Sequence, residues 1–426
     1  MHPEIQTLKL QSGVSEFILG SVLNLQKLLY LKIAPYSRRS YFNCYAVKSH
    51  QLHTLDLSGS RLREPTTYLS ILMTCKESLQ ILNISNCWNV EDDFLLKLFR
   101  ICGRKLLSLD ISSTSIKGEN LSEYNGTLPF IDNLSFDICQ QLSKDGMQKI
   151  ISICGANPPS LRINYEEIPQ NPSTDDKKSL LCLQHLSLAN CGSFTEKGLR
   201  KILQLCGRTL KKLDLSSTQI TGETLSEGNG IFLNNMEELD LSSCYKLTDA
   251  GLLCLLNLCG ENLKKLDISS TQITGENMTQ DNRISLVCVK ELGLNCCNKL
   301  TDIGIKRILQ LCSRALKSLN LSGTNTTGET LAEGTDTSLA CLENLNLEWC
   351  TQLTDTAFVR TIQLCGRTLK SLDISSTNIT LQNLTEYDGT LPCIEHIILK
   401  GCRKLTDIGL IQLLQLPEKK LKSLRI

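Results

Sequence analysis

The chain repeats a leucine-rich pattern about every 53 residues, and this period constrains its fold more than any other feature. The segment KKLDLSST at 211–218 returns as KKLDISST at 264–271, and KSLDISST stands at 370–377. A second pattern, which ends in cysteine, alternates with it: EELDLSSC at 237–244, KELGLNCC at 290–297 and ENLNLEWC at 343–350. We call the two patterns threonine-type and cysteine-type repeats. One repeat cannot bury its apolar face alone, so the period predicts a solenoid of stacked repeats.

Residues 237–263 show how one cysteine-type repeat is expected to fold. Leu239 and Leu241 alternate with polar residues, which predicts a half-buried strand. Thr248 and Asp249 offer side-chain oxygens to the free amides of a helix start. The apolar stripe of that helix is Leu252, Leu255, Leu256 and Cys259, and Gly260 ends it.

Stacking such units predicts an α/β solenoid with a parallel sheet on the concave side and helices on the convex side. The curvature follows because helices need about 10 Å between their axes and strands less than 5 Å. Threonine-type repeats have room only for a short helix before a glycine, as in QITGETLSEGNG at 219–230. We therefore expect long helices in alternate repeats.

Three regions depart from the period. Residues 1–50 form an irregular N-terminal region, of weak repeats or a cap, before a solenoid over 51–426. Residues 156–180 are a degenerate repeat, and we expect a protruding loop at 165–179 that is either a binding element or a decayed repeat without a role. The chain stops in mid-repeat at LKSLRI, which predicts a monomer unless the exposed C-terminal edge pairs.

The 21 cysteines follow the repeat, which argues against a disulfide scaffold. Members of one series are two repeats apart, about 10 Å, whereas a disulfide needs Cα atoms within about 7 Å. We interpret the cysteines as small buried hydrophobic residues and expect all of them to be free.

Charge and hydropathy argue against a nucleic-acid-binding protein and against a membrane protein. The net charge of +1 gives no reason to expect nucleic acid or an anionic membrane as a partner. No run of 18 apolar residues and no signal peptide are present, so the expected location is the cytosol or the nucleus.

One column of the concave face is acidic. It contains Asp214, Asp240 and Asp267 on consecutive strands, about 5 Å apart, and beside it Lys212, Glu238, Lys265 and Glu291 alternate in sign. The aspartates are either a solvated feature of the repeat, balanced by the lysines, or an acidic patch for a basic partner.

The positions just before the closing cysteine vary most, and they hold the other candidates for partner binding. Trp349 stands on the rim of the concave face beside Glu348, with Lys400 and Asn295 at equivalent places in other repeats. We expect either that Trp349 anchors a protein partner or that it packs on its neighbouring repeat.

Catalysis, metals and cofactors find no support. GxSxG, HExxH and P-loop patterns are missing, no CxxC pair occurs, and the five histidines have no ligand spacing. We therefore expect no catalytic residue, no metal site, no cofactor and no enzyme activity.

The pattern LxLxxC followed by LTDxG resembles the cysteine-containing class of leucine-rich repeats, with a horseshoe of the ribonuclease-inhibitor kind. The match is carried by CYKLTDAGL at 244–252, CNKLTDIGI at 297–305, CTQLTDTAF at 350–358 and CRKLTDIGL at 402–410. This class is best known from F-box proteins of SCF ubiquitin ligases, where the concave face and the C-terminal end hold the target. The resemblance implies target recognition, with SCF components as further partners and ubiquitin-dependent degradation as the process, although residues 1–50 do not show an F-box. The alternative is a sensor, decoy or regulator module, because similar repeats occur in innate-immune receptors.

Overall fold

The fold is described from a computed structural model. The described residues are 5–10, 27–33, 50–59, 65–131, 133–136, 139, 141–143, 146, 149–150, 153, 160–162, 183–190, 196–226, 230–278, 284, 286–312, 315–329, 337–387, 389–417 and 420–426. They fall into two compact units, residues 1–189 (unit 1) and 190–426 (unit 2). The loop predicted at 165–179 lies outside the described residues.

Each unit contains a parallel sheet whose strands follow the order of the sequence. In unit 1 the strands are β1 (Thr7–Leu10), β2 (Tyr30–Ile33), β3 (Thr54–Asp56), β4 (Ile81–Asn83), β5 (Ser108–Asp110), β6 (Asn133–Ser135), β7 (Ser160–Arg162) and β8 (His185–Ser187). In unit 2 they are β9 (Lys212–Asp214), β10 (Glu238–Asp240), β11 (Lys265–Asp267), β12 (Glu291–Gly293), β13 (Ser318–Asn320), β14 (Asn344–Asn346), β15 (Ser371–Asp373), β16 (His396–Ile398) and β17 (Ser423–Arg425). Equivalent leucines pair in register, such as Leu239 with Leu266.

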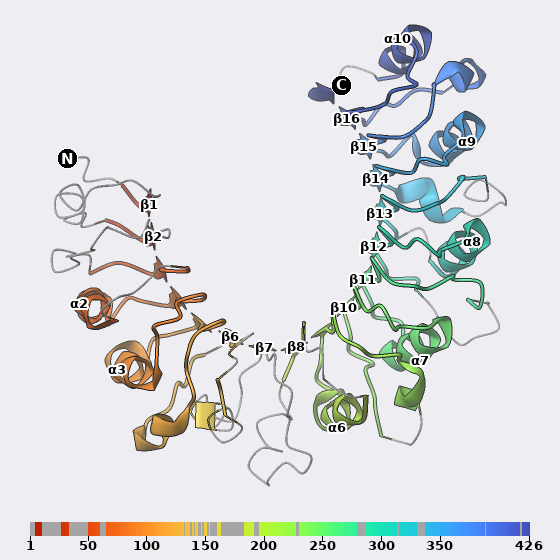
Figure 1. Cartoon of the computed structure of the whole chain (residues 1–426). Helices are drawn as coiled ribbons and strands as arrows, with labels where there is room; N and C mark the ends of the chain where they lie inside the picture. Colours follow the sequence, from red (N-terminus) through yellow and green to blue (C-terminus); the bar gives the residue numbers. More distant parts are fainter. Residues whose placement is uncertain are drawn as a thin grey trace. The chain divides into compact units, whose positions relative to one another are not determined.

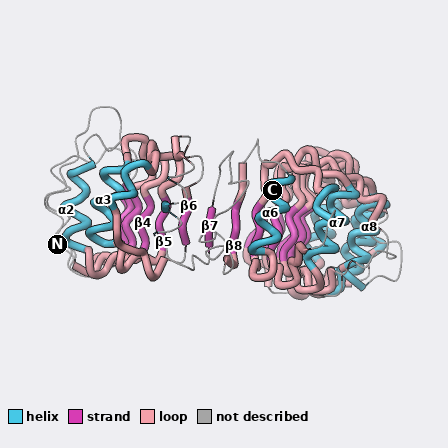
Figure 2. The backbone as a smooth tube through the Cα atoms, turned by 90° about the horizontal axis from the view of Figure 1, so that it is seen from below, coloured by secondary structure: helices cyan, strands magenta, loops and turns pink. Residues whose placement is uncertain are grey.

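The helices form the second layer of each unit. Unit 1 has α2 (Pro65–Cys75), α3 (Asp92–Cys102) and the 3-10 helix η1 (Glu119–Glu123). Unit 2 has α6 (Glu196–Cys206), α7 (Asp249–Cys259), α8 (Asp302–Leu311), α9 (Asp355–Cys365) and α10 (Asp407–Gln415), with the 3-10 helices η2 (Glu223–Ser226), η3 (Thr337–Cys341) and η4 (Gln382–Glu386). In unit 2 the strands line the inner side of a curved stack and the helices its outer side (Figure 1). Figure 2 shows the same separation of strands and helices from below.

Long and short helices alternate in unit 2. Its cysteine-type repeats carry α6 to α10, whereas η2, η3 and η4 belong to threonine-type repeats. The core between the layers consists mainly of strand leucines and of the apolar stripe of each helix; Leu239, Leu252 and Leu255 are buried. The predicted solenoid of alternating repeats is confirmed.

The helix starts lock neighbouring repeats together. Thr248 caps α7 as expected, since its hydroxyl accepts the Gly251 amide at 3.0 Å. Asp249 does not cap its own helix, and that expectation is wrong: its carboxylate reaches the following threonine-type repeat and accepts the amides of Thr274 at 2.9 Å and Gly275 at 3.2 Å. The reason is that Thr248 already satisfies the first free amide, which leaves the next side chain available for the neighbouring turn. We call this contact the carboxylate clamp; Asp92, Glu196, Asp302 and Asp355 make it as well.

The same helix start also packs on the preceding turn. A Cβ added to Gly251 would lie 1.8 Å from the carbonyl oxygen of Thr221, and Gly222 beside it has a φ of +84°. Two glycines are therefore needed where the helix start and the turn meet. The helix α7 therefore begins between two threonine-type turns, one packed against it and one held by its carboxylate.

Threonine and cysteine occupy the same place after alternating strands. Thr271 donates its hydroxyl to the Ile268 carbonyl at 2.7 Å, and Cys297 of the next repeat donates its thiol to the same carbonyl at 3.1 Å. Thr218 and Cys244 share the Leu215 carbonyl in the same way. The closing cysteines are therefore hydrogen-bond donors as well as core filler.

Candidate functional site

The three predicted aspartates lie in register on β9, β10 and β11. Each carboxylate accepts the backbone amide two residues further on: Ser216 at 3.0 Å, Ser242 at 2.9 Å and Ser269 at 3.0 Å. Asn346 and Asp373 make the same contact in later repeats. One role of these aspartates is therefore to hold the turn after their own strand.

The neighbouring charges are paired along the sheet. Lys212 lies 2.6 Å from Glu238 and Lys265 lies 3.3 Å from Glu291, so both lysines pair with glutamates rather than with the aspartates. Burial raises the pKa of Asp240, and the charges of Asp267 and Asp214 add to the rise. This column is the acidic part of the inner face.

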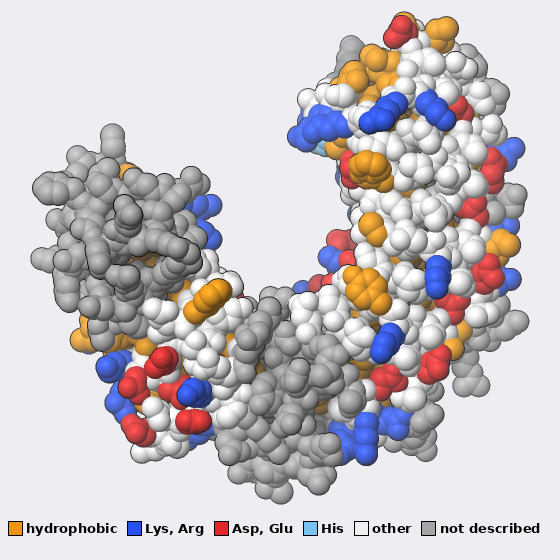
Figure 3. Space-filling model, in the orientation of Figure 1, with side chains coloured by type: hydrophobic (Ala, Val, Ile, Leu, Met, Phe, Trp, Pro, Cys, Tyr) orange, Lys and Arg blue, Asp and Glu red, His pale blue; other side chains and the backbone are white. Residues whose placement is uncertain are grey.

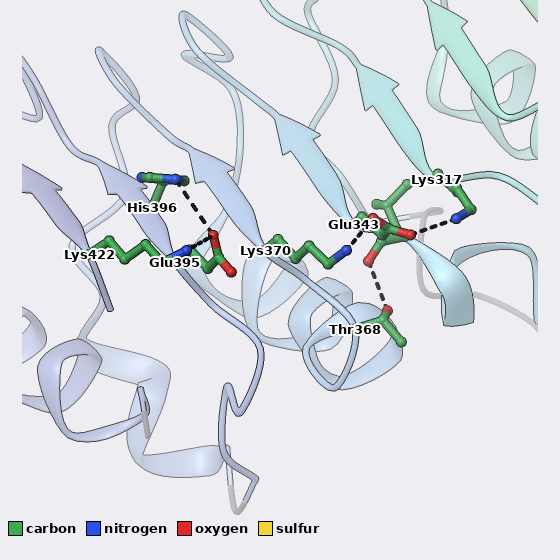
Figure 4. A network of polar contacts seen from close by, with 8 residues as sticks. Lys317, Glu343, Thr368, Lys370, Glu395, His396 and Lys422 are labelled. Carbon is green, nitrogen blue, oxygen red and sulfur yellow. Dashed lines mark hydrogen bonds and ion pairs between the residues drawn. The ribbon is translucent and has the colours of Figure 1, made fainter. Parts of the chain in front are cut away.

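A second ladder of ion pairs runs where the strands of unit 2 begin (Figure 4). Glu343 lies between Lys317 at 2.8 Å and Lys370 at 2.6 Å, and these hydrogen bonds lower its pKa to about 2. Glu395 pairs with Lys422 at 2.9 Å. These carboxylates already have cationic partners within the chain, which makes them weaker candidates for binding a partner.

Trp349 occupies a turn that disfavours its side chain. Its φ is +60°, in the left-handed region. The same place after other strands has positive φ too, and small or polar residues fill it: Gly59, Asn86, Ser113, Asn190, Ser217, Ser243, Ser270, Cys296, Gly323, Ser376 and Gly401. A bulky residue in this conformation costs about 1–2 kcal/mol. The Trp349 side chain is nevertheless 60 % exposed.

The surroundings of Trp349 contain the other predicted residues only in part. Glu348 is half-buried, and Lys400 is exposed two repeats further on. Asn295, two repeats back, is engaged by its neighbours, since its amide oxygen accepts Ser269 Oγ at 2.5 Å and Asn320 Nδ2 at 3.1 Å. The structure places Asp214, Asp240 and Asp267 three to five strands away from β14, so they do not form one site with Trp349.

Sequence reasoning missed Ser375, which lies between Glu348 and Lys400. Its hydroxyl is buried and has no hydrogen-bond partner among the described residues. The equivalent serines use their hydroxyls: Ser216 donates to Asp214 of its own repeat, and Ser269 donates to Asn295 of the next repeat. No signal in the sequence marks this difference, because serine is the common residue at that position.

Hydrophobic side chains also appear elsewhere on this side of unit 2. Figure 3 shows them as separate patches along the inner border, with largely uncharged surface between them. Tyr245 is exposed in the turn after β10, and in unit 1 Trp88 is 71 % exposed after the equivalent cysteine. Neither residue has a positive φ, so Trp349 alone among these aromatics combines exposure with an unfavourable backbone.

The cysteines that the structure describes are free thiols. Those at helix ends are buried, and burial raises the pKa to about 12 for Cys102, Cys206, Cys259 and Cys365, which keeps them protonated. The interpretation as core filler is wrong for Cys288, which precedes a strand, and for Cys296, which lies in the turn after that strand; both are exposed. Four others are only half-buried: Cys254, Cys341, Cys393 and Cys402.

The described ranges offer neither a metal site nor a membrane span. No group of three His, Cys, Asp or Glu residues there has the placement to hold a metal ion. Among the described helices, none has the length and hydropathy to cross a bilayer.

Comparisons with known proteins agree with the fold. Residues 208–226 and 232–256 match the leucine-rich-repeat family model. The chain is 25 % identical over 305 residues to DNA repair protein rhp7 of Schizosaccharomyces pombe. The aligned region covers 67 % of this chain and 52 % of that protein. It is 27 % identical over 167 residues to F-box/LRR-repeat protein 4 of Bos taurus, 38 % of this chain and 26 % of that protein. The chain thus spans about half or less of the length of these relatives.

A solved structure extends the agreement over nearly the whole chain. TLR13 in its complex with ssRNA13 superposes with a TM-score of 0.50 at 16 % identity, covering 99 % of this chain and 69 % of that protein. This likeness concerns the fold alone. The fold is that of a leucine-rich-repeat solenoid, and an F-box/LRR protein is among the proteins to which the chain is similar.

Proposed function

We propose that the chain is a non-catalytic target-recognition solenoid, like the leucine-rich-repeat part of an SCF substrate receptor, and that its target binds around Trp349. The observation that carries the proposal is an exposed tryptophan at φ +60°, where the other described repeats have Gly, Ser, Asn or Cys. Residues held in unfavourable backbone conformations cluster at functional sites, and tryptophan is enriched among binding hot spots.

The first test removes the anchor. Trp349→Ala combined with Glu348→Ala should weaken target binding at least tenfold, as truncation of a hot spot does, while the melting temperature stays unchanged or rises slightly. The matched control is Trp88→Ala, an exposed tryptophan in a turn of unit 1, which should leave binding unchanged. Equal binding by the double variant and the wild type would place the target elsewhere.

The second test concerns the ligase role, which the relative named F-box/LRR-repeat protein 4 supports. Purified full-length protein is incubated with a Skp-type adaptor and a cullin, and a stable complex is expected on gel filtration. If neither adaptor nor cullin binds, the SCF role is wrong, and a target-binding role without a ligase, as in a sensor or decoy, is what remains. We place the protein in the cytosol or the nucleus, and fluorescence of the tagged chain tests this.

A further inference from the structure

The surface around Trp349 has a shape that suits a flat side chain. The Gly323 amide donates to the Glu348 carbonyl at 2.7 Å, and the Trp349 amide donates to the Ser375 carbonyl at 2.8 Å, so the turns of three consecutive repeats stack directly. The residues equivalent to Trp349 on either side are Gly323 and Ser376, and Gly401 follows. Small residues therefore flank the indole, and its faces have no bulky neighbour in the equivalent turns.

The charges around the indole are not matched within the chain. Glu348 is half-buried, and among the described residues its carboxylate has no ion pair, unlike Glu343 of the same repeat and Glu291 of an earlier one. A carboxylate without a cation within the chain is available to a cation that a partner supplies.

One kind of side chain suits both the indole and the carboxylate. A guanidinium is planar and cationic, so it stacks on an indole face and pairs with a carboxylate. An aliphatic side chain would cover the indole but would leave Glu348 without a partner. Building on the target-binding role proposed above, we infer that this patch, Trp349 and Glu348, takes an arginine side chain from an extended segment of the target.

Lys400 adds a second element of specificity. It is exposed and has no ion pair among the described residues, and it lies two repeats beyond Glu348. Two strand spacings amount to about 10 Å, which an extended segment spans in about three residues. An acidic residue about three places from the arginine therefore meets Lys400, whereas a second basic residue there is repelled. The segment is of the Arg-x-x-Glu kind rather than polybasic.

The experiment uses Trp349 as its own reporter. The chain has two tryptophans, so the full chain with Trp88→Phe leaves Trp349 as the only one. The probe is the blocked peptide Ala-Arg-Ala-Ala-Glu-Ala, titrated while the tryptophan fluorescence is followed. Two matched peptides carry citrulline in place of arginine, which keeps the shape without the charge, or lysine in place of glutamate.

A saturable change is expected with the arginine peptide, with at least about tenfold weaker binding for the citrulline peptide and a smaller loss for the lysine peptide. Glu348→Gln should weaken binding of the arginine peptide to a similar extent, while Glu291→Gln, a paired carboxylate elsewhere on the inner face, should not. Equal binding of arginine and citrulline peptides, or no saturable response at millimolar peptide, would overturn the inference.

The outcome is separable from that of the proposed function. If the peptides fail but the variant Trp349→Ala with Glu348→Ala still loses the target, the binding surface stands and the arginine is wrong. If target binding also survives those substitutions, the surface itself is wrong.

Discussion

The two repeat types share one strand and one core, but their outer halves have opposite roles. The cysteine-type repeat carries a long helix with Thr and Asp at its start, as in α7, whereas the threonine-type repeat carries a short turn that contributes backbone amides. The helix start of one type holds the turn of the other through the carboxylate clamp. The comparison teaches that alternate repeats are complementary halves of one structural unit.

Removing a clamp should have the largest effect. Asp249→Ala leaves the amides of Thr274 and Gly275 without their acceptor, and hydrogen bonds to a charged group contribute about 2 kcal/mol. We expect the free energy of unfolding to fall by roughly that amount, measured by urea denaturation. Asp407→Ala is the matched control, since this exposed aspartate begins α10 in the same way but makes no side-chain hydrogen bond to a described residue. Equal losses in both variants would show that the clamp is not the cause.

The acidic clamp at Glu196 should respond to pH. Burial alone would raise the pKa of this carboxyl, but hydrogen bonds from Thr221, Thr224 and Gly222 outweigh it and lower the pKa from 4.5 to about 2. Because the folded pKa is the lower one, the contribution to stability is complete above the unfolded value and is lost as the pH falls from 4.5 towards 2. The difference in unfolding free energy between wild type and Glu196→Gln should shrink over that range. A difference that is independent of pH would contradict the proposed ionised clamp.

A smaller loss of stability is expected when one of the two donors to a shared carbonyl, the closing threonine or the closing cysteine, is replaced. Thr271→Val removes a hydroxyl that donates to the Ile268 carbonyl and should cost about 1 kcal/mol. Cys297→Ala removes the weaker thiol donor at the same carbonyl and also some buried volume, so its loss combines both contributions. Cys297→Ser restores a donor of smaller size, and it should recover part of the stability in urea denaturation. If Ser is no better than Ala, the thiol acts through packing alone.

The smallest change is expected to be a gain. Trp349→Asn places at φ +60° a residue that other repeats already have there, at Asn86 and Asn190. Relief of the backbone should raise the free energy of unfolding by up to about 1 kcal/mol, seen as a higher melting temperature. Ser376→Trp is the reverse experiment in a threonine-type repeat and should lower it. A loss of stability in Trp349→Asn would mean that the indole packs on its neighbours.

The period allowed the strands, the alternation of helices and the leucine core to be predicted, because each depends only on which residues recur. The clamp was not predicted, since Thr248 and Asp249 are both good cap residues and the sequence does not tell which repeat each one faces. Trp349 and Glu348 were identified as departures from the period. The left-handed backbone of that turn and the unsatisfied Ser375 hydroxyl are properties of the folded chain, and the residue types in the sequence do not predict them. The aspartates were read as a surface feature, and their hydrogen bonds to the following turns became visible only in the structure.

The carboxylate clamp also has a direction, since each carboxylate reaches towards the next turn along the chain and each helix start rests on the turn before it. Copying a single repeat during evolution would set two cysteine-type repeats side by side, with an aspartate that faces a helix start instead of a turn. Copying a pair keeps every contact. The pair of repeats is therefore the smallest segment that such a gene can gain or lose while every clamp carboxylate still faces a turn. This accounts for a sequence period of about 53 residues, which is two repeats.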